Sequence, residues 1–245
     1  MEKILIVIPS YNEAKNIGKF LEDIIAIKKE NEDILVVDDG STDNTAEIVK
    51  QYDCRYIRQI YNCGYGNALQ LGYKYAVKYG YDYIIQMDAD GQHKAENLYA
   101  IRQAIADDDF DILLGSRFLK ESKSFNVGFL KRRVIRFFES IIYLFSKTVI
   151  TDPTSGLQCL NKRAFSYYAE YNNFDSMYPD MNIIIQMTYN GYKIKEFPAH
   201  MVDRNVGVSM HSGIIKPFKY MIIITIATIS VFIRKKNNKW KYINI

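Results

Sequence analysis

Residues 34–43 read Ile-Leu-Val-Val-Asp-Asp-Gly-Ser-Thr-Asp. The first four residues are apolar, as in a strand buried on both faces, and two carboxylates follow them. The turn Gly40-Ser41-Thr42-Asp43 is suited to cap a helix, which is predicted over Asn44–Gln51. This succession of buried strand, polar turn and helix is the unit from which parallel sheets are built.

The same unit recurs between residues 3 and 115, where short runs rich in Ile and Val alternate with segments of helical periodicity. Strands are predicted at Ile4–Ile8, Ile34–Asp38, Arg55–Ile60, Tyr83–Met87 and Asp111–Leu114. Helices are predicted at Glu13–Lys28, Asn44–Gln51, Gly66–Tyr79 and Ala95–Ala106. Farther on, helices are predicted at Lys131–Phe145 and Asp180–Asn190, and an edge strand at Lys193–Pro198. The predicted fold is therefore α/β, with a doubly wound, mostly parallel sheet.

The composition is that of a folded globular protein. Hydrophobic residues make up 48% and charged residues 24% of the 245 residues, which excludes a disordered or low-complexity chain. The three cysteines form no CxxC pair, so we expect free thiols. The net charge is only +4, and the one dense basic cluster is terminal, which does not indicate nucleic-acid binding; it consists of Arg234, Lys235, Lys236, Lys239 and Lys241. One catalytic domain is predicted over residues 1–212.

Polar clusters follow the predicted strands, at the edge where open parallel sheets bind ligands. Four such clusters begin at Pro9, Asp38, Asp88 and Gly115. The sharpest is Asp88-Ala89-Asp90, because carboxylates at i and i+2 of an extended segment point to the same side and can share a hard divalent cation. Gln92 and His93 would add ligands. Mg²⁺ or Mn²⁺ bound there would bridge a diphosphate and assist its departure.

Other polar residues suit a nucleotide and its phosphates. Asp39 stands at a strand end, where a carboxylate can accept hydrogen bonds from a base or a ribose hydroxyl. Guanidinium groups suited to bidentate phosphate contact belong to Arg117, Arg132, Arg133 and Arg204. Each of these arginines has the alternative of a solvated surface role. Asn62–Gly66 is interpreted as a Gly-rich turn from strand to helix.

Four motifs occur together in a known order. They are Ile-Pro-Ser-Tyr-Asn-Glu at 8–13, Val-Val-Asp-Asp-Gly-Ser-Thr-Asp at 36–43, Asp-Ala-Asp-Gly-Gln-His at 88–93 and Gly-Ser-Arg-Phe at 115–118. This order resembles family 2 glycosyltransferases, and most closely their dolichyl- and polyprenyl-phosphate sugar transferases, over residues 1 to about 210. The resemblance implies a GT-A fold, a UDP- or GDP-sugar donor, a divalent metal and inversion at the anomeric carbon.

The resemblance also implies roles for individual positions. Nucleotide binding is implied for Pro9, Tyr11, Glu13, Val37, Asp39, Asp88 and Ala89. Metal binding is implied for Asp88, Asp90 and Gln92, with Asp88, Asp90 and Arg117 as the catalytic residues. Arg117 and Arg204 would contact phosphate, and the loop Asp152–Gly156, with Ser155, would lie near the acceptor.

Two kinds of acceptor fit these motifs. A sugar hydroxyl loses a proton as it attacks and needs a positioned carboxylate, whereas a lipid phosphate is already ionised. Members that act on hydroxyls often carry an acidic pair where this chain has Tyr178-Pro179-Asp180-Met181. This favours polyprenyl phosphate. The alternative is a hydroxyl of a growing polysaccharide or lipid-linked glycan, with Asp180 as the catalytic base.

Two rival classes fit the sequence less well. A nucleotidyltransferase would also place carboxylates at strand ends, but residues 9–16 are not the Gly-rich, Lys-bearing phosphate loop that it would need. A non-catalytic glycan-binding relic of the fold would be expected to have a damaged metal site, whereas Asp88 and Asp90 are both present.

An apolar run of 14 residues, Tyr220–Ile233, precedes a basic tail. As a helix it would span about 21 Å, short of the roughly 30 Å hydrocarbon core of a bilayer. Residues 213–245 are therefore predicted to form a membrane-associating helix in the plane of the cytoplasmic membrane surface. The alternative is a helix docked on the core or on a partner. A small membrane protein that holds the enzyme at the bilayer is a further hypothesis.

Overall fold

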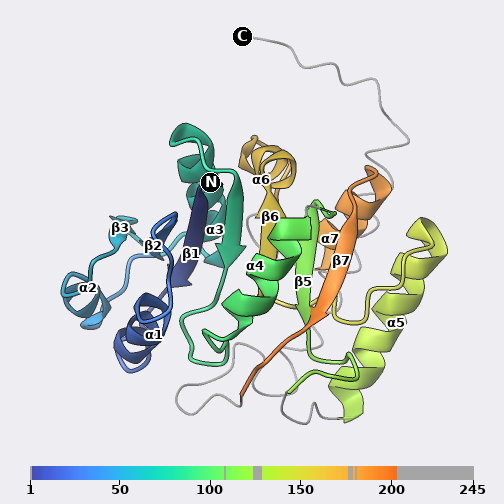
Figure 1. Cartoon of the computed structure of the whole chain (residues 1–245), viewed down its shortest axis with the longest axis horizontal. Coiled ribbons are helices and arrows are strands. Elements are labelled where there is room, and N and C mark those ends of the chain that lie inside the picture. The colour runs from blue at the N-terminus through green and yellow to red at the C-terminus, as the bar shows by residue number, and fades with distance from the viewer. Residues whose placement is uncertain (1, 108, 124–128, 176–178, 180, 203–245) are drawn as a thin grey trace.

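The computed structural model describes residues 2–107, 109–123, 129–175, 179 and 181–202, and these form one sheet with helices on both faces (Figure 1). The strands are β1 (Ile4–Ser10), β2 (Glu32–Asp38), β3 (Arg55–Arg58), β4 (Tyr83–Gln86), β5 (Ile112–Ser116), β6 (Gln158–Asn161) and β7 (Ile194–Pro198). Their order is β3-β2-β1-β4-β6-β5-β7. β6 runs antiparallel to both of its neighbours, and every other pairing is parallel.

Two hydrophobic clusters hold the helices to the sheet. The helices are α1 (Ile17–Ile25), α2 (Thr45–Val49), α3 (Tyr65–Lys78), α4 (Asn97–Asp107), α5 (Phe129–Ser146), α6 (Lys162–Ala169) and α7 (Met181–Tyr189). Alternate residues of β1 face opposite sides, as the two-residue period of a strand requires. Ile4, Ile6 and Ile8 pack with α1, α2 and α4, whereas Leu5 and Val7 pack with α3, α5, α6 and α7.

The doubly wound, mostly parallel sheet confirms the predicted fold class. All six predicted strands occur with shifted ends, and β7 is an edge strand. The sequence did not predict β6 or α6. Gln158–Asn161 has four residues, two of them polar, so it lacks the apolar run by which the other central strands are recognised.

This topology brings the predicted clusters together. The carboxyl ends of β1, β2, β4 and β5 meet at the lower edge of the sheet in Figure 1. Ser10 is paired with Asp38 across β1 and β2. Because β6 is antiparallel, the loop Asp152–Gly156 that precedes it lies at the same edge.

None of the described helices is long and apolar enough to cross a membrane. The predicted domain boundary at residue 212 and the membrane-associating segment 213–245 lie outside the described residues.

Candidate active site

The first wall of the site is made by the loops after β1 and β2, which are joined by hydrogen bonds. The backbone N–H of Asn12 donates to Ser41 Oγ at 3.0 Å, and that of Glu13 donates to Thr45 Oγ1 at 2.9 Å. Asp38 is fully buried and accepts hydrogen bonds from the Ser41 N–H at 2.8 Å and the Tyr56 hydroxyl at 2.6 Å. Ser41, one of the two predicted helix caps, therefore links the two loops instead, whereas Asp43, the other, accepts a hydrogen bond from the Thr45 N–H at the start of α2 at 2.9 Å.

Asp39 fixes the turn that leads from β3 to α3. Its carboxylate accepts hydrogen bonds from the backbone N–H of Cys63 at 2.7 Å and of Gly64 at 2.8 Å. Gly40 has φ 72°, and a Cβ there would lie 2.7 Å from the carbonyl carbon of Tyr61. The segment Asn62–Gly66 is thus the Gly-rich turn predicted from the sequence, and Asp39 has a structural role beside any contact with a nucleotide.

The other residues predicted to bind a nucleotide lie along the same wall. Pro9 and Val37 are paired across β1 and β2, and both are buried. The side chain of Tyr11 is 44% exposed at the end of β1, where a planar ligand could reach it. Glu13 accepts a hydrogen bond from Asn16 Nδ2 at 2.6 Å.

The loop after β4 carries the predicted metal ligands. Asp88 Oδ1 accepts a hydrogen bond from the Tyr65 hydroxyl at 2.8 Å, and Asp90 Oδ1 accepts one from the Gln92 N–H at 3.0 Å. Ala89 and Asp90 form a turn, so the extended conformation assumed for Asp88–Asp90 is wrong. The turn arises because Gly91, at φ 78°, reverses the chain.

His93 supports this loop as a neutral imidazole. Its Nδ1 accepts a hydrogen bond from the Asp88 N–H at 2.9 Å, and the residue is 5% exposed. Burial, aided by Arg117, lowers the pKa of His93 to about 4, although Asp90 acts in the opposite direction. Its Nδ1 is engaged with the backbone, so His93 orients Asp88 through the chain.

The oxygen donors on this loop suit a hard divalent ion. Asp88, Asp90 and Gln92 offer two carboxylates and one amide oxygen, which is the donor chemistry of Mg²⁺ and Mn²⁺. No group of three or more His, Cys, Asp or Glu side chains that could hold a metal occurs within the described part of the chain. An ion bound here would therefore need further ligands from a substrate or from solvent.

Arg117 at the end of β5 forms a buried ion pair with Asp152. The guanidinium Nε lies 2.6 Å from Asp152 Oδ2, and a terminal nitrogen lies 2.7 Å from Oδ1. The two side chains are 10% and 0% exposed. Sequence reasoning expected Arg117 to contact phosphate. In the structure its bidentate partner is a carboxylate, so the phosphate contact stays a prediction.

The loop Asp152–Gly156 is held to the sheet by two further groups. Ser155 is buried, and its hydroxyl donates to the Gly115 carbonyl at 2.6 Å. Glu196 of β7 accepts hydrogen bonds from the backbone N–H groups of Thr151 and Asp152 at 2.8–2.9 Å. Burial raises the pKa of Glu196, with these hydrogen bonds opposing the shift. The Ser155 side chain thus positions the loop, and its predicted acceptor contact remains untested.

A cavity of about 180 Å³ opens beside this loop, under α5. It is lined by Phe118, Arg132, Ile135, Arg136, Glu139 and Thr151. The Phe118 ring lies 5.7 Å from the guanidinium carbon of Arg117 and 5.9 Å from that of Arg132. Arg133, on the same helix, is exposed. The cavity therefore combines two arginines and one acidic side chain, Glu139, with apolar walls next to the strand ends.

Asp180 and Arg204, predicted as catalytic base and phosphate ligand, lie outside the described residues.

Comparison with known proteins assigns the family. The model of glycosyl transferase family 2 matches residues 5–168. The chain belongs to this family. It is therefore a glycosyltransferase, and its sheet and helices form the GT-A fold.

Relatives of this glycosyltransferase span nearly its whole length. An uncharacterized protein of Methanocaldococcus jannaschii is 33% identical over 226 residues, covering 90% of each chain. The UDP-N-acetylglucosamine–dolichyl-phosphate N-acetylglucosaminyltransferase of Methanococcus voltae is 28% identical over 234 residues, covering 88% of this chain and 92% of that protein.

Among solved structures, glucosyl-3-phosphoglycerate synthase of Mycobacterium tuberculosis, in complex with Mn²⁺, UDP and glucosyl-3-phosphoglycerate, has a similar fold. Its TM-score is 0.65 at 15% identity, and the match covers 93% of this chain and 78% of that one.

Sequence reasoning missed the contacts of three residues in the glycosyltransferase site, although Gly156 belongs to the loop predicted near the acceptor. Tyr65 and Gly156 both contact Asp88, and Arg136 lines the cavity. The first two are far from Asp88 in sequence, so no local pattern marks them. Arg136 could have been found, because it lies one helical turn after Arg132 in a predicted helix.

Proposed function

We propose that this glycosyltransferase moves a sugar, with inversion, from a UDP- or GDP-sugar to polyprenyl phosphate. The observation that carries the proposal is the Asp88–Asp90 loop, which follows β4 at the same edge of the sheet as the nucleotide-suited residues of the β1 and β2 ends. A cavity lined by Arg132 and Arg136 opens next to Thr151, before the loop Asp152–Gly156. A relative of similar length is named for transfer from UDP-N-acetylglucosamine to dolichyl phosphate, which supports this choice of substrates.

The donor would bind at the ends of β1, β2 and β4. Pro9, Tyr11 and Val37 would frame the base, with Glu13 and Asp39 near the ribose. Asp88, Asp90 and Gln92 would hold Mg²⁺ or Mn²⁺, and a bound ion would neutralise charge on the departing nucleoside diphosphate. Ala89, buried at 2% exposure, would lie against the diphosphate as the floor of the site.

The acceptor would approach from the side of α5. Arg132 and Arg136 line the cavity, so they could bind a lipid phosphate, with the Phe118 ring packing against its first isoprene unit. The guanidinium of Arg117 is bound by Asp152, so we assign it the positioning of the loop Asp152–Gly156 in addition to any phosphate contact. A phosphate acceptor needs no catalytic base, since it is already ionised.

We further propose that the enzyme works at the inner face of the cell membrane. α5 carries an exposed arc with apolar Phe137 and Leu144, which are 54% and 63% exposed, beside exposed Arg133 and Arg136. An apolar and basic helix face suits an anionic lipid surface. Residues 213–245 would add a second contact, on the bilayer or on a small membrane-protein partner.

The test is a transfer assay with the full chain. The enzyme is incubated with radiolabelled UDP- and GDP-sugars, Mg²⁺ or Mn²⁺, and either polyprenyl phosphate or the matching polyprenol, and the label extracted into organic solvent is counted. We expect label in the organic phase with polyprenyl phosphate and none with the polyprenol. Donor hydrolysis without lipid labelling would contradict the proposal, and would favour a glycan hydroxyl acceptor with Asp180 as the base.

A further inference from the structure

The carboxylate of Asp88 is held from two sides by residues for which the sequence predicts no contact with a metal ligand. Tyr65, at the first position of α3, donates its hydroxyl hydrogen to Oδ1 at 2.8 Å. On the other side Gly156 lies against Oδ2, because a Cβ on Gly156 would come within 2.3 Å of that oxygen. His93 Nε2 also lies 3.9 Å from Oδ2, so the orientation of the Asp88 carboxylate is set by this neighbour together with groups 23 and 68 residues away in the sequence.

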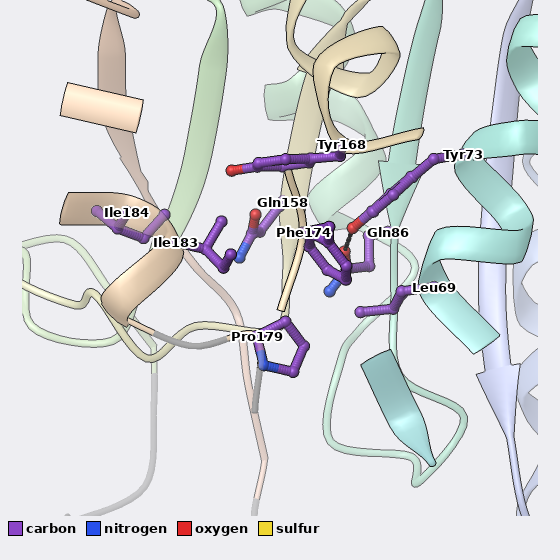
Figure 2. Close-up of a pocket in the computed structure, with 9 residues that line it drawn as sticks. All are labelled: Leu69, Tyr73, Gln86, Gln158, Tyr168, Phe174, Pro179, Ile183 and Ile184. Carbon is purple, nitrogen blue, oxygen red and sulfur yellow. Dashed lines mark hydrogen bonds between the residues drawn. The ribbon is translucent and has the colours of Figure 1, made fainter. Parts of the chain in front are cut away.

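A buried amide fixes the direction of the Tyr65 hydrogen bond. Gln86 Nε2 donates to the Tyr65 oxygen at 3.1 Å and to the Gly156 carbonyl at 3.0 Å. Gln86 Oε1 in turn accepts from the Tyr73 hydroxyl at 2.7 Å, the contact drawn in Figure 2. Since Gln86 is the donor toward Tyr65, the one hydroxyl hydrogen of Tyr65 is left for Asp88.

Figure 2 shows that two members of this network, Tyr73 and Gln86, line a small cavity inside the protein. Tyr73 and Gln86 face it from α3 and β4, together with Gln158 of β6. Gln86 is 2% exposed and Tyr73 is 1% exposed, so bulk water does not compete for these hydrogen bonds. A buried network whose members are all hydrogen-bonded has little freedom to rearrange, and it transmits this rigidity to Asp88.

We propose that Tyr65 and Gly156 are positioning residues that fix the Asp88 carboxylate in the orientation that binds the divalent ion. The inference rests on the metal site of the proposed function. Groups that orient a metal ligand typically change metal affinity by about 10- to 100-fold when they are removed. Tyr65 acts through the Oδ1 hydrogen bond, and Gly156 acts by leaving room for Oδ2.

The test measures Mn²⁺ affinity directly, by the electron paramagnetic resonance signal of free Mn²⁺ in the presence of UDP. Tyr65→Phe should weaken Mn²⁺ binding at least about tenfold. The matched control is Tyr81→Phe. Tyr81, which is buried, also donates to a carboxylate, Asp33, at 2.6 Å, but Asp33 lies at the opposite end of the sheet. The Mn²⁺ affinity of Tyr81→Phe should equal that of the wild type.

Gly156→Ala provides an independent variant. Gly156 is not in the left-handed region, so alanine strains no backbone there, but its Cβ must displace the Asp88 carboxylate. We expect weakened Mn²⁺ binding again, with a circular dichroism spectrum like that of the wild type. Wild-type affinity in both Tyr65→Phe and Gly156→Ala would overturn the inference. If the wild type itself bound no Mn²⁺ with UDP, the metal site of the proposed function would fail, and the inference with it.

Discussion

Replacing Asp152 by Asn tests whether the Arg117–Asp152 pair organises the acceptor side of the site. The substitution keeps the size and shape of the side chain and removes its charge. The Arg117 guanidinium, 10% exposed, would then lose its bidentate carboxylate at 2.6 and 2.7 Å. Removing one partner of a buried ion pair costs about 3–5 kcal/mol, because the other charge stays desolvated.

The free energy of unfolding in urea, followed by far-ultraviolet circular dichroism, measures this cost. Asp23→Asn is the matched control, because Asp23 forms a 2.7 Å ion pair with Lys19 on the exposed face of α1. This pair lies in water, so we expect the control to leave the unfolding midpoint unchanged.

A double variant shows whether the loss of stability in Asp152→Asn comes from the unpaired buried charge or from lost hydrogen bonds to the loop Asp152–Gly156. Arg117→Met combined with Asp152→Leu removes both charges and keeps apolar volume, so it should be less destabilised than Asp152→Asn alone. A cost below about 1 kcal/mol for Asp152→Asn would refute the reasoning, since it would mean that solvent screens the pair. A double variant less stable than Asp152→Asn would refute it as well, because the burial of charge would not be the cause.

Three further predictions concern the nucleotide and metal side. Asp90→Ala should abolish metal-dependent donor turnover while the fold, followed by circular dichroism, stays intact; retained turnover would contradict the metal assignment. Gly40→Ala should cost about 1–3 kcal/mol from the left-handed φ alone, with more from the Tyr61 contact, in the same urea assay. The pKa of His93 is lowered to about 4 in the folded protein, against about 6.5 in the unfolded chain. Between these two pH values the unfolded chain binds a proton that the folded protein does not, so the metal-free protein should lose stability as the pH falls from about 6.5 to about 4. His93→Gln should flatten this pH dependence; an unflattened profile would contradict the assignment.

Much of the fold could be predicted because the central strands are apolar runs between turn residues. This pattern was enough to predict strands at Ile4–Ile8 and Ile34–Asp38. The rule that parallel strands end at the same edge of a sheet then placed Pro9 and Asp39 together. β6 could not be predicted in this way, because it is buried by the strands on either side of it. The four residues Gln158–Asn161 show neither an apolar run nor an alternation of apolar and polar residues.

The sequence predicted which polar clusters form the site, but it did not predict which side chains these clusters contact inside the protein. Asp88 could be placed at the edge of the sheet from its position after an apolar run. Its contact with Tyr65 depends on how α3 packs on the sheet, and a single sequence carries no signal for such a pair. Arg117 was expected to face the substrate because residues at the carboxyl ends of parallel strands usually face the ligand. Its ion pair with Asp152 could not be predicted, because it depends on the unpredicted strand β6.

The most direct measurement is the position of Mn²⁺ in crystals grown with UDP, read from anomalous scattering at the manganese edge. The account predicts one strong peak between the carboxylates of Asp88 and Asp90, within ligand distance of Gln92 and of the UDP diphosphate. A peak elsewhere, or UDP bound with no metal at this loop, would contradict it.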